Sequence, residues 1–241
     1  MSSLRVATAI AERELRAYLF SASGYIIIAL FMLVTGIIFS LRVFEQGAVS
    51  SLRDVFGAGT WLLAFIAPAI TMRLFSEEYR LGTFEGLMTA PVRNVQVVAG
   101  KFGGALALLI VMLLPTLIFV VALEIYGRPD YGEVATGYFG LVLAGALYLA
   151  SGMVASILTS SQPVAFLVTL FFWLAIGFAA RELPALLNEE HAAIIYAADP
   201  RLRLNDFCIG LVDTSNVMYF VTLTLFFLLT ALAVLEVRRC R

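Results

Sequence analysis

Five stretches of this chain contain no Asp, Glu, Lys or Arg, and each is long enough to hold at least one membrane-spanning helix. They cover residues 17–41, 55–72, 102–123, 134–180 and 214–235. A helix needs about 20 mostly apolar residues to cross the hydrocarbon core of a bilayer. In a soluble domain about 25% of residues are charged, whereas this chain has 14%. The charge pattern therefore predicts a polytopic membrane protein.

The fourth stretch, 47 residues long, is too long for one span and fits two. It divides at Thr159–Pro163, a polar cluster that ends in a residue favoured at helix starts. Open sheets cannot cross a bilayer, because their edge groups stay unsatisfied, and the polarity of these stretches does not alternate as in barrel strands. We therefore expect an all-α fold and a single transmembrane domain over residues 1–241. Its six expected spans are 24–41, 56–75, 102–124, 137–158, 163–180 and 216–236.

Other global features exclude several classes of protein. The net charge of −1 gives no reason to expect a nucleic-acid partner. The two cysteines, Cys208 and Cys240, do not form a disulfide framework. The residues before the first apolar stretch carry both signs of charge, so we expect no cleavable signal peptide.

Six spans place both termini on one side of the membrane. If that side is the cytoplasm, the inner segments hold ten of the Lys and Arg residues and the outer segments hold six. Inner loops are normally richer in Lys and Arg, so the sequence predicts a multi-pass protein with both termini in the cytoplasm. Cys208 then lies outside and Cys240 inside.

Residues 1–20 have the pattern of an amphipathic helix. At 100° per residue one face is apolar and the opposite face is charged, with Glu14 as the exception at the edge of the apolar face. The apolar face holds Leu4, Ala7, Ala11, Leu15 and Tyr18. The pattern predicts an interfacial helix before the first span, and the alternative is a charged, solvated segment that only orients that span.

The spans lack the chemistry of an independent pump or enzyme. They contain no ionisable group in their interior, which disfavours a proton- or ion-coupled carrier. Gly100-Lys101 is followed by Phe102, so no phosphate-binding loop is formed. No catalytic or metal-binding constellation is visible, and the only histidine, His191, is expected in a solvated loop. Energy for active transport must therefore enter from a partner. Pro68 and Pro115 predict either hinges or static kinks in their spans.

The segment after the second span has the features of a docking element. Gly82 can end a helix and Thr83 can cap a new one, with Glu85 in its first turn. Three apolar residues share one face of that short helix: Phe84, Leu87 and Met88. Such a helix can insert into a groove of a soluble partner or lie on lipid headgroups, and the pattern alone leaves both open.

Three stretches carry a resemblance to a known family. Residues 76–85, followed by Thr89-Ala90-Pro91-Val92 and Gly100-Lys101-Phe102, resemble the cytoplasmic loop of ABC-2 type permeases. Residues 13–18 with 24–26 resemble the family's N-terminal interfacial helix, and residues 210–220 resemble the start of its last span. Within the family, the chain is most similar to gliding-motility-associated permeases, with copper-enzyme maturation permeases nearby.

This resemblance implies a type V ABC transporter half that is itself not an enzyme. Such permeases pair as homodimers or heterodimers in the bacterial inner membrane, and each docks on a separate ATPase that binds ATP and Mg. By this resemblance residues 76–100 form the cytoplasmic coupling loop, and residues 181–215 form an extracytoplasmic segment with re-entrant helices. An extracytoplasmic auxiliary protein is a further possible partner. The residues implied in coupling are Glu77, Glu78, Arg80, Thr83, Phe84, Glu85, Leu87 and Met88. The alternative is a non-transporting mechanical or signalling component driven by the same kind of ATPase.

Overall fold

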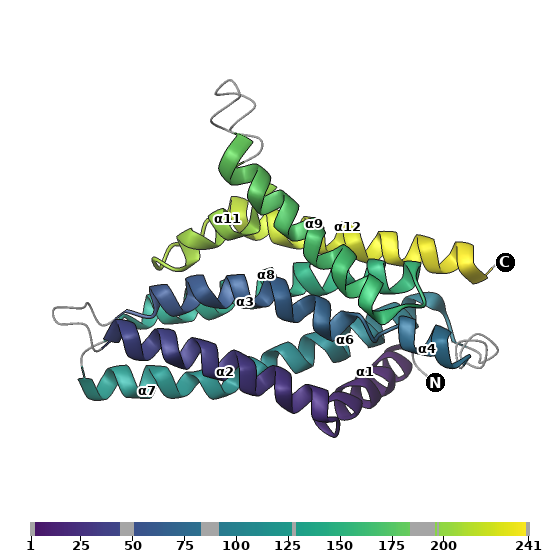
Figure 1. The fold of residues 1–241 in the computed structure, drawn as a ribbon, viewed down its shortest axis with the longest axis horizontal. Helices are drawn as coiled ribbons and strands as arrows, with labels where there is room; N and C mark the ends of the chain where they lie inside the picture. The colour runs from purple at the N-terminus through teal and green to yellow at the C-terminus, as the bar shows by residue number, and fades with distance from the viewer. Residues whose placement is uncertain are drawn as a thin grey trace.

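A computed structural model describes residues 3–43, 51–82, 92–126, 129–183, 196 and 198–239. Within these residues all regular structure is helical (Figure 1). Six helical segments are long and apolar enough to cross a membrane: Ala22–Arg42, Arg53–Leu81, Asn94–Ile125, Tyr131–Leu158, Gln162–Glu182 and Thr214–Arg238. The expected all-α fold with six spanning helices is thus confirmed at this level.

The described elements follow in this order: α1 (Ser3–Leu19), α2 (Ala22–Val43), α3 (Arg53–Thr71), α4 (Ser76–Leu81), α6 (Asn94–Leu113), the 3-10 turn η1 (Leu114–Thr116), α7 (Leu117–Tyr126), α8 (Tyr131–Leu158), α9 (Gln162–Glu182), α11 (Pro200–Phe207) and α12 (Thr214–Arg239). Helix α6 begins at Asn94, eight residues before the expected start of the third span at 102. Lys101 therefore lies inside the helix, where ion pairs offset its charge, and the bounds of the span within this helix stay a prediction.

Helix α8 forms the centre of the bundle. It contacts α3, α6, α9, α11 and α12. Glycines of α8 lie where side chains of α6 and α3 pack against its backbone. A Cβ on Gly145 would lie 2.2 Å from Leu109, and one on Gly152 would lie 2.1 Å from the Thr71 hydroxyl. Small residues allow this close packing, on which the association of helices in a bilayer depends.

The break between α6 and α7 occurs at Pro115. Proline cannot donate a backbone hydrogen bond, and here the chain forms the 3-10 turn Leu114–Thr116. The Thr116 hydroxyl donates to the carbonyl oxygen of Leu113 (2.6 Å) and is 2.8 Å from the Tyr138 hydroxyl on α8. The break is therefore attached to the central helix. Pro68, in contrast, lies within the continuous helix α3.

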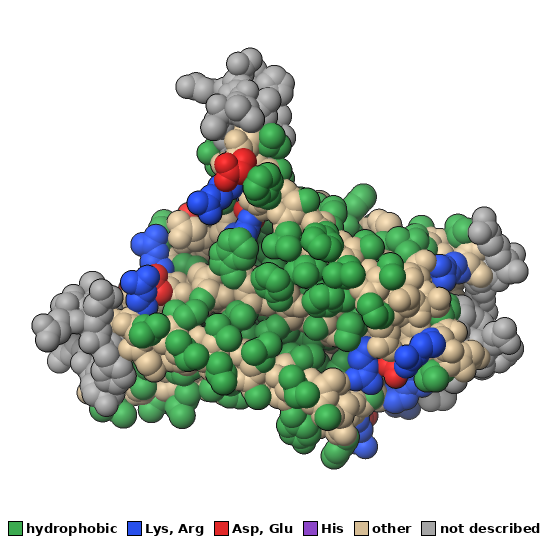
Figure 2. All heavy atoms as spheres, viewed as in Figure 1, with side chains coloured by type: hydrophobic (Ala, Val, Ile, Leu, Met, Phe, Trp, Pro, Cys, Tyr) green, Lys and Arg blue, Asp and Glu red, His purple; other side chains and the backbone are tan. Residues whose placement is uncertain are grey.

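Polar and apolar surfaces are separated along the bundle. On the face shown in Figure 2, hydrophobic side chains cover the middle, and charged side chains gather at the two ends. Both termini and α4 lie at one end, which we call the α4 end, whereas α11 lies towards the other, the α11 end (Figure 1). Large apolar side chains such as Leu30, Phe171 and Phe226 face outward, as expected of lipid-facing spans.

The packing of α8 leads to a prediction about Gly152. Replacing Gly152 with Val should lower the free energy of unfolding of the purified chain by about 1–3 kcal/mol, because the added side-chain atoms overlap the Thr71 side chain. Gly57→Val is the matched control, since no atom lies within 4 Å of a Cβ at that position. Thermal unfolding in detergent measures the difference. Equal stability of the two variants would show that the α3–α8 contact is not tight.

Candidate coupling site

A buried lysine organises the α4 end of the bundle. The Lys101 side chain is only 1% exposed. Its ammonium group makes ion pairs with Glu14 of α1 (2.9 Å) and Glu78 of α4 (2.8 Å), and it donates to the carbonyl oxygen of Leu74 (2.6 Å). The same group lies 5.0 Å from the centre of the Phe75 ring. A buried ammonium needs such partners, because its desolvation otherwise costs several kcal/mol. We call Lys101, Glu14, Glu78 and Arg13 the Lys101 node.

Helix α1 reaches this node because two glycines of α6 allow close approach. A Cβ on Gly100 would lie 2.7 Å from the Ile10 Cβ, and one on Gly104 would lie 2.7 Å from the Glu14 Cβ. The glycine spacing and the ion pair thus support the same contact between α1 and α6. This contact explains why an acidic residue, Glu14, lies at the edge of the apolar face of α1: its carboxylate pairs with Lys101.

The apolar face of α1 requires a correction. It was expected to lie on the membrane, but it packs against the protein. Tyr18 is 3% exposed, and its hydroxyl donates to the carbonyl oxygen of Ile70 at 2.6 Å. Burial, reinforced by the nearby Glu14 carboxylate, raises the pKa of the Tyr18 hydroxyl well above its usual value. Apolar periodicity marks a buried face and does not distinguish lipid from a neighbouring helix.

Helix α4 contributes the second carboxylate of the node. One oxygen of Glu78, Oε1, accepts from Lys101 and from Arg13 (3.4 Å). The other oxygen, Oε2, is buried and has no hydrogen-bond partner within the described part of the chain. Glu77 forms an ion pair with Arg73 (2.9 Å), which also donates to the Ser23 hydroxyl (2.6 Å). Arg73, Glu77, Glu78 and the other residues of the Lys101 node line a cavity of about 280 Å³ between α1 and α4.

The turn between α3 and α4 is fixed to the central helix through Ser156 of α8. The Ser156 hydroxyl accepts from the backbone N–H groups of Phe75 (3.0 Å) and Ser76 (3.2 Å). The Ser76 hydroxyl donates in turn to the carbonyl oxygen of Ser156 (3.1 Å). Helix α4 then ends at Gly82, whose φ of 69° is a left-handed conformation that glycine adopts without strain. The expectation that Gly82 ends a helix is confirmed.

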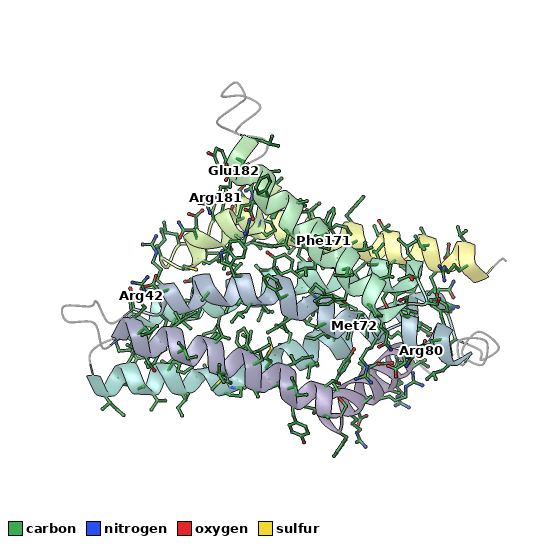
Figure 3. The ribbon with its side chains drawn as sticks, in the orientation of Figure 1. Arg42, Met72, Arg80, Phe171, Arg181 and Glu182 are labelled. Carbon is green, nitrogen blue, oxygen red and sulfur yellow. The ribbon has the colours of Figure 1, made fainter. Side chains whose placement is uncertain are left out.

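The structure locates some of the expected coupling residues. Glu77 and Glu78 bind cations of their own chain, and Arg80 is exposed on α4 at the end of the bundle (Figure 3). The remaining expected residues lie outside the described residues: Thr83, Phe84, Glu85, Leu87 and Met88. Sequence reasoning missed the node itself. Two signals pointed to it: a lysine next to an uncharged span, and a lone acid on an apolar helix face.

These features define a class: a polytopic helical membrane subunit in which the N-terminal helix, the segment after the second span and the third span meet in one buried ionic cluster. A family model described as ABC-2 family transporter protein matches residues 8–194, so the chain belongs to the ABC-2 family. A search of curated proteins finds none that matches the chain. Membrane subunits of this family normally have no catalytic activity and work with ABC ATPase subunits, and membership implies a role in transport.

The node leads to a prediction about Lys101. Lys101→Met should destabilise the chain by about 3 kcal/mol or more, because it leaves the Glu14 and Glu78 carboxylates without their common cation. Adding Glu14→Gln and Glu78→Gln to this variant should restore much of the loss, since the amides carry no charge.

Arg80→Met is the matched control, because it removes one positive charge from an exposed position of the same end. It should change stability by no more than about 0.5 kcal/mol. Thermal unfolding of the four proteins in detergent gives the comparison. If Lys101→Met and Arg80→Met have the same melting temperature, the ion pairs of the node do not stabilise the fold.

Proposed function

We propose that the chain is the membrane-spanning, non-catalytic subunit of an ATP-driven ABC transporter in the bacterial inner membrane. It receives energy from a separate ATPase subunit that binds ATP and Mg, and it acts in a pair with a second permease subunit, either a second copy or a homologue. Family membership supports the transporter class. The resemblance of residues 76–85, 89–92 and 100–102 to the cytoplasmic loop of ABC-2 permeases also supports the class. Within it we propose the gliding-motility-associated branch, with the copper-enzyme maturation permeases as its neighbour.

The observation that carries the proposal is the anchoring of both sides of residues 83–91. The segment follows α4, which is held by Glu78 at the Lys101 node and by Ser76 at Ser156. It precedes α6, which begins at Asn94 and contains Lys101. A partner that binds residues 83–88 therefore acts on two helices, α4 and α6, that are both bonded to the rest of the bundle. Through Glu14, the same node also connects this movement to α1.

The structure also changes the role that we assign to the neighbouring charges. Glu77 and Glu78 are engaged within the chain, so we propose that they position α4 and do not bind the ATPase directly. Arg80 is exposed and remains available to a partner. Thr83–Met88 supply the apolar anchors of the docking helix, with Phe84 and Leu87 at its centre.

We propose that the α4 end faces the cytoplasm. Both termini and α4 lie at this end (Figure 1), and the Lys and Arg excess of the corresponding segments, ten against six, favours this side. An auxiliary protein, if the complex has one, then meets the chain at the α11 end.

A docking variant tests the proposed coupling. Phe84→Ser with Leu87→Ser should abolish co-purification of the ATPase subunit and its ATP hydrolysis, while membrane insertion stays normal. Buried interface anchors typically contribute about 2 kcal/mol or more each.

The control is Leu158→Ser with Val164→Ser, which removes two exposed apolar side chains from the turn between α8 and α9 at the same end. The control should retain the ATPase. Retention of the ATPase by both double variants would mean that residues 83–88 are not the coupling element.

Thiol labelling tests the orientation. In a Cys208→Ser variant, Cys240 is the only thiol, and a membrane-impermeant maleimide should label it only after the cells are permeabilised. Labelling in intact cells would place the C-terminus outside and contradict the proposal.

The reciprocal variant, Cys240→Ser, tests the environment of Cys208. This thiol is buried at the end of α11, and burial raises its pKa to about 11. Only the thiolate reacts, so at pH 8 about 0.1% of the thiol is in the reactive form. Labelling from outside should therefore be slow in the folded chain, rise as the pH increases towards 11, and become fast in denaturant. Fast labelling of the folded chain at pH 7 would contradict the burial of Cys208.

A further inference from the structure

A large cavity lies at the α11 end of the described part of the chain, far from the Lys101 node. It has a volume of about 970 Å³ and lies between α3, α9 and α11. Pockets of about 300–1,000 Å³ are typical for small organic ligands. Arg53 and Arg181 lie at its outer end, Trp61, Leu174 and Phe178 line it further along α3 and α9, and the paired Arg201 and Asp199 lie beside Trp61.

The outer part of the cavity carries one arginine, Arg53, that no described carboxylate balances. Three arginines and two aspartates line it among the described residues. Asp54 is paired with Arg42 (3.3 Å), an arginine outside the cavity. Arg53 donates to the Asn205 side chain (3.3 Å) and has no carboxylate within ion-pair distance among the described residues. Arg181 stands at the end of α9 with a side chain that is 85% exposed, and it forms an ion pair with Glu182 (3.5 Å) (Figure 3). Arg53 is therefore the cation of the mouth that can meet an anion without giving up a described carboxylate partner.

The third arginine is held in place below the mouth. The Arg201 guanidinium lies 4.0 Å from the centre of the Trp61 ring and forms two-pronged contacts with Asp199, the closest at 2.7 Å. Gly177 leaves room for it, because a Cβ there would lie 1.6 Å from Nη2. Its other terminal nitrogen, Nη1, has no hydrogen bond to any described residue. Arg201 is thus a fixed guanidinium with donors still available, which suits a phosphate or carboxylate.

The inner part of the cavity is apolar and follows the membrane-spanning part of α3 and α9. Trp61 is 50% exposed and Phe178 is 69% exposed, and Leu174 lies a turn further along α9. Trp61 is about 12 Å from Arg53 along the helix axis, at 1.5 Å per residue. The cavity therefore extends from a cationic mouth into the hydrocarbon region.

We propose that this cavity binds an anionic amphiphile, a molecule with a phosphate-like head group and a hydrocarbon tail. The head group lies against Arg53, Arg181 and Arg201, and the tail lies along Trp61, Leu174 and Phe178. A small free anion would leave the apolar wall exposed, and a neutral lipid would leave Arg53 without a counter-charge. The proposal goes beyond the coupling function and does not depend on it, because binding is measured on the chain without ATP or ATPase.

Trp61 provides the signal for a direct test. The chain has two tryptophans, so Trp173→Phe leaves Trp61 as the only one. The purified full chain in a non-ionic detergent is titrated with short-chain phosphatidylglycerol or phosphatidylcholine that carries bromine on the acyl chain, which quenches nearby indole fluorescence. We expect saturable quenching by phosphatidylglycerol at concentrations at least about tenfold lower than those needed for phosphatidylcholine.

Three variants in this background separate the cavity from general charge attraction. Arg53→Gln with Arg181→Gln should raise the half-saturating concentration of phosphatidylglycerol about tenfold or more. Ala58→Phe keeps all charges and fills the cavity, so it should remove the saturable component. Arg16→Gln removes an exposed positive charge at the opposite end and should leave the curve unchanged. Size-exclusion profiles and melting temperatures identify any variant that is misfolded, and only folded variants are compared.

Three results would overturn the proposal. Equal quenching by the two lipids, or unchanged quenching in Ala58→Phe, would mean that the indole contacts bulk detergent and lipid and not a bound anionic amphiphile. Inorganic phosphate at millimolar concentration should compete weakly, because it lacks a tail. Competition by phosphate at the affinity of the lipid would assign the arginines to a small anion and contradict the amphiphile.

Discussion

The arrangement of the α4 end depends on the ionic contacts of one buried ammonium group. Lys101 lies within a helix long enough to cross a bilayer, and it is stable there only because carboxylates from α1 and α4 reach it. This requirement fixes three segments relative to one another: the N-terminal helix, the start of the loop after α3, and α6. The glycine contacts of α6 with α1 are the steric counterpart of the same constraint, since without them Glu14 could not come within 2.9 Å of the lysine. Helix α1 is therefore packed onto the bundle through this contact.

The charged groups of the Lys101 node share several ion pairs, but one of its carboxylate oxygens lacks a hydrogen bond to any described residue. Glu14 and Glu78 share Lys101, Arg13 lies beside both, and one oxygen of Glu78 is buried without a partner among the described residues. A buried carboxylate oxygen without a donor is unfavourable, so the present position of α4 is stabilised less than a fully bonded network would allow. By contrast, the Ser156 contacts satisfy two backbone N–H groups at the turn before α4. The turn is thus the more firmly held point, and the Glu78 contacts are the part of α4 that a bound partner can most easily rearrange.

The sequence predicted the number and type of helices because a bilayer imposes a minimum length on each apolar segment, and charge-free stretches measure that length directly. It also predicted the end of α4, since Gly82 adopts a conformation that other residues rarely adopt. It did not predict where α6 begins, because a lysine next to an apolar stretch usually marks the edge of a membrane-spanning segment. The partners that stabilise Lys101 within the helix are 87 and 23 residues away, and local patterns carry no information about such pairs. The burial of α1 was missed for a different reason: contact with lipid and contact with a helix favour the same apolar periodicity.

Helix α3 connects the two ends physically. It begins at Arg53, at the mouth of the outer cavity, and contributes Trp61 to its wall. It ends at Thr71, packed against Gly152, and the chain continues directly to Leu74, whose carbonyl oxygen accepts from Lys101. The opposite wall of the cavity, α9, contacts both α3 and α8. Helix α3 is thus the element that lines the outer cavity at its start and leads into the Lys101 node at its end.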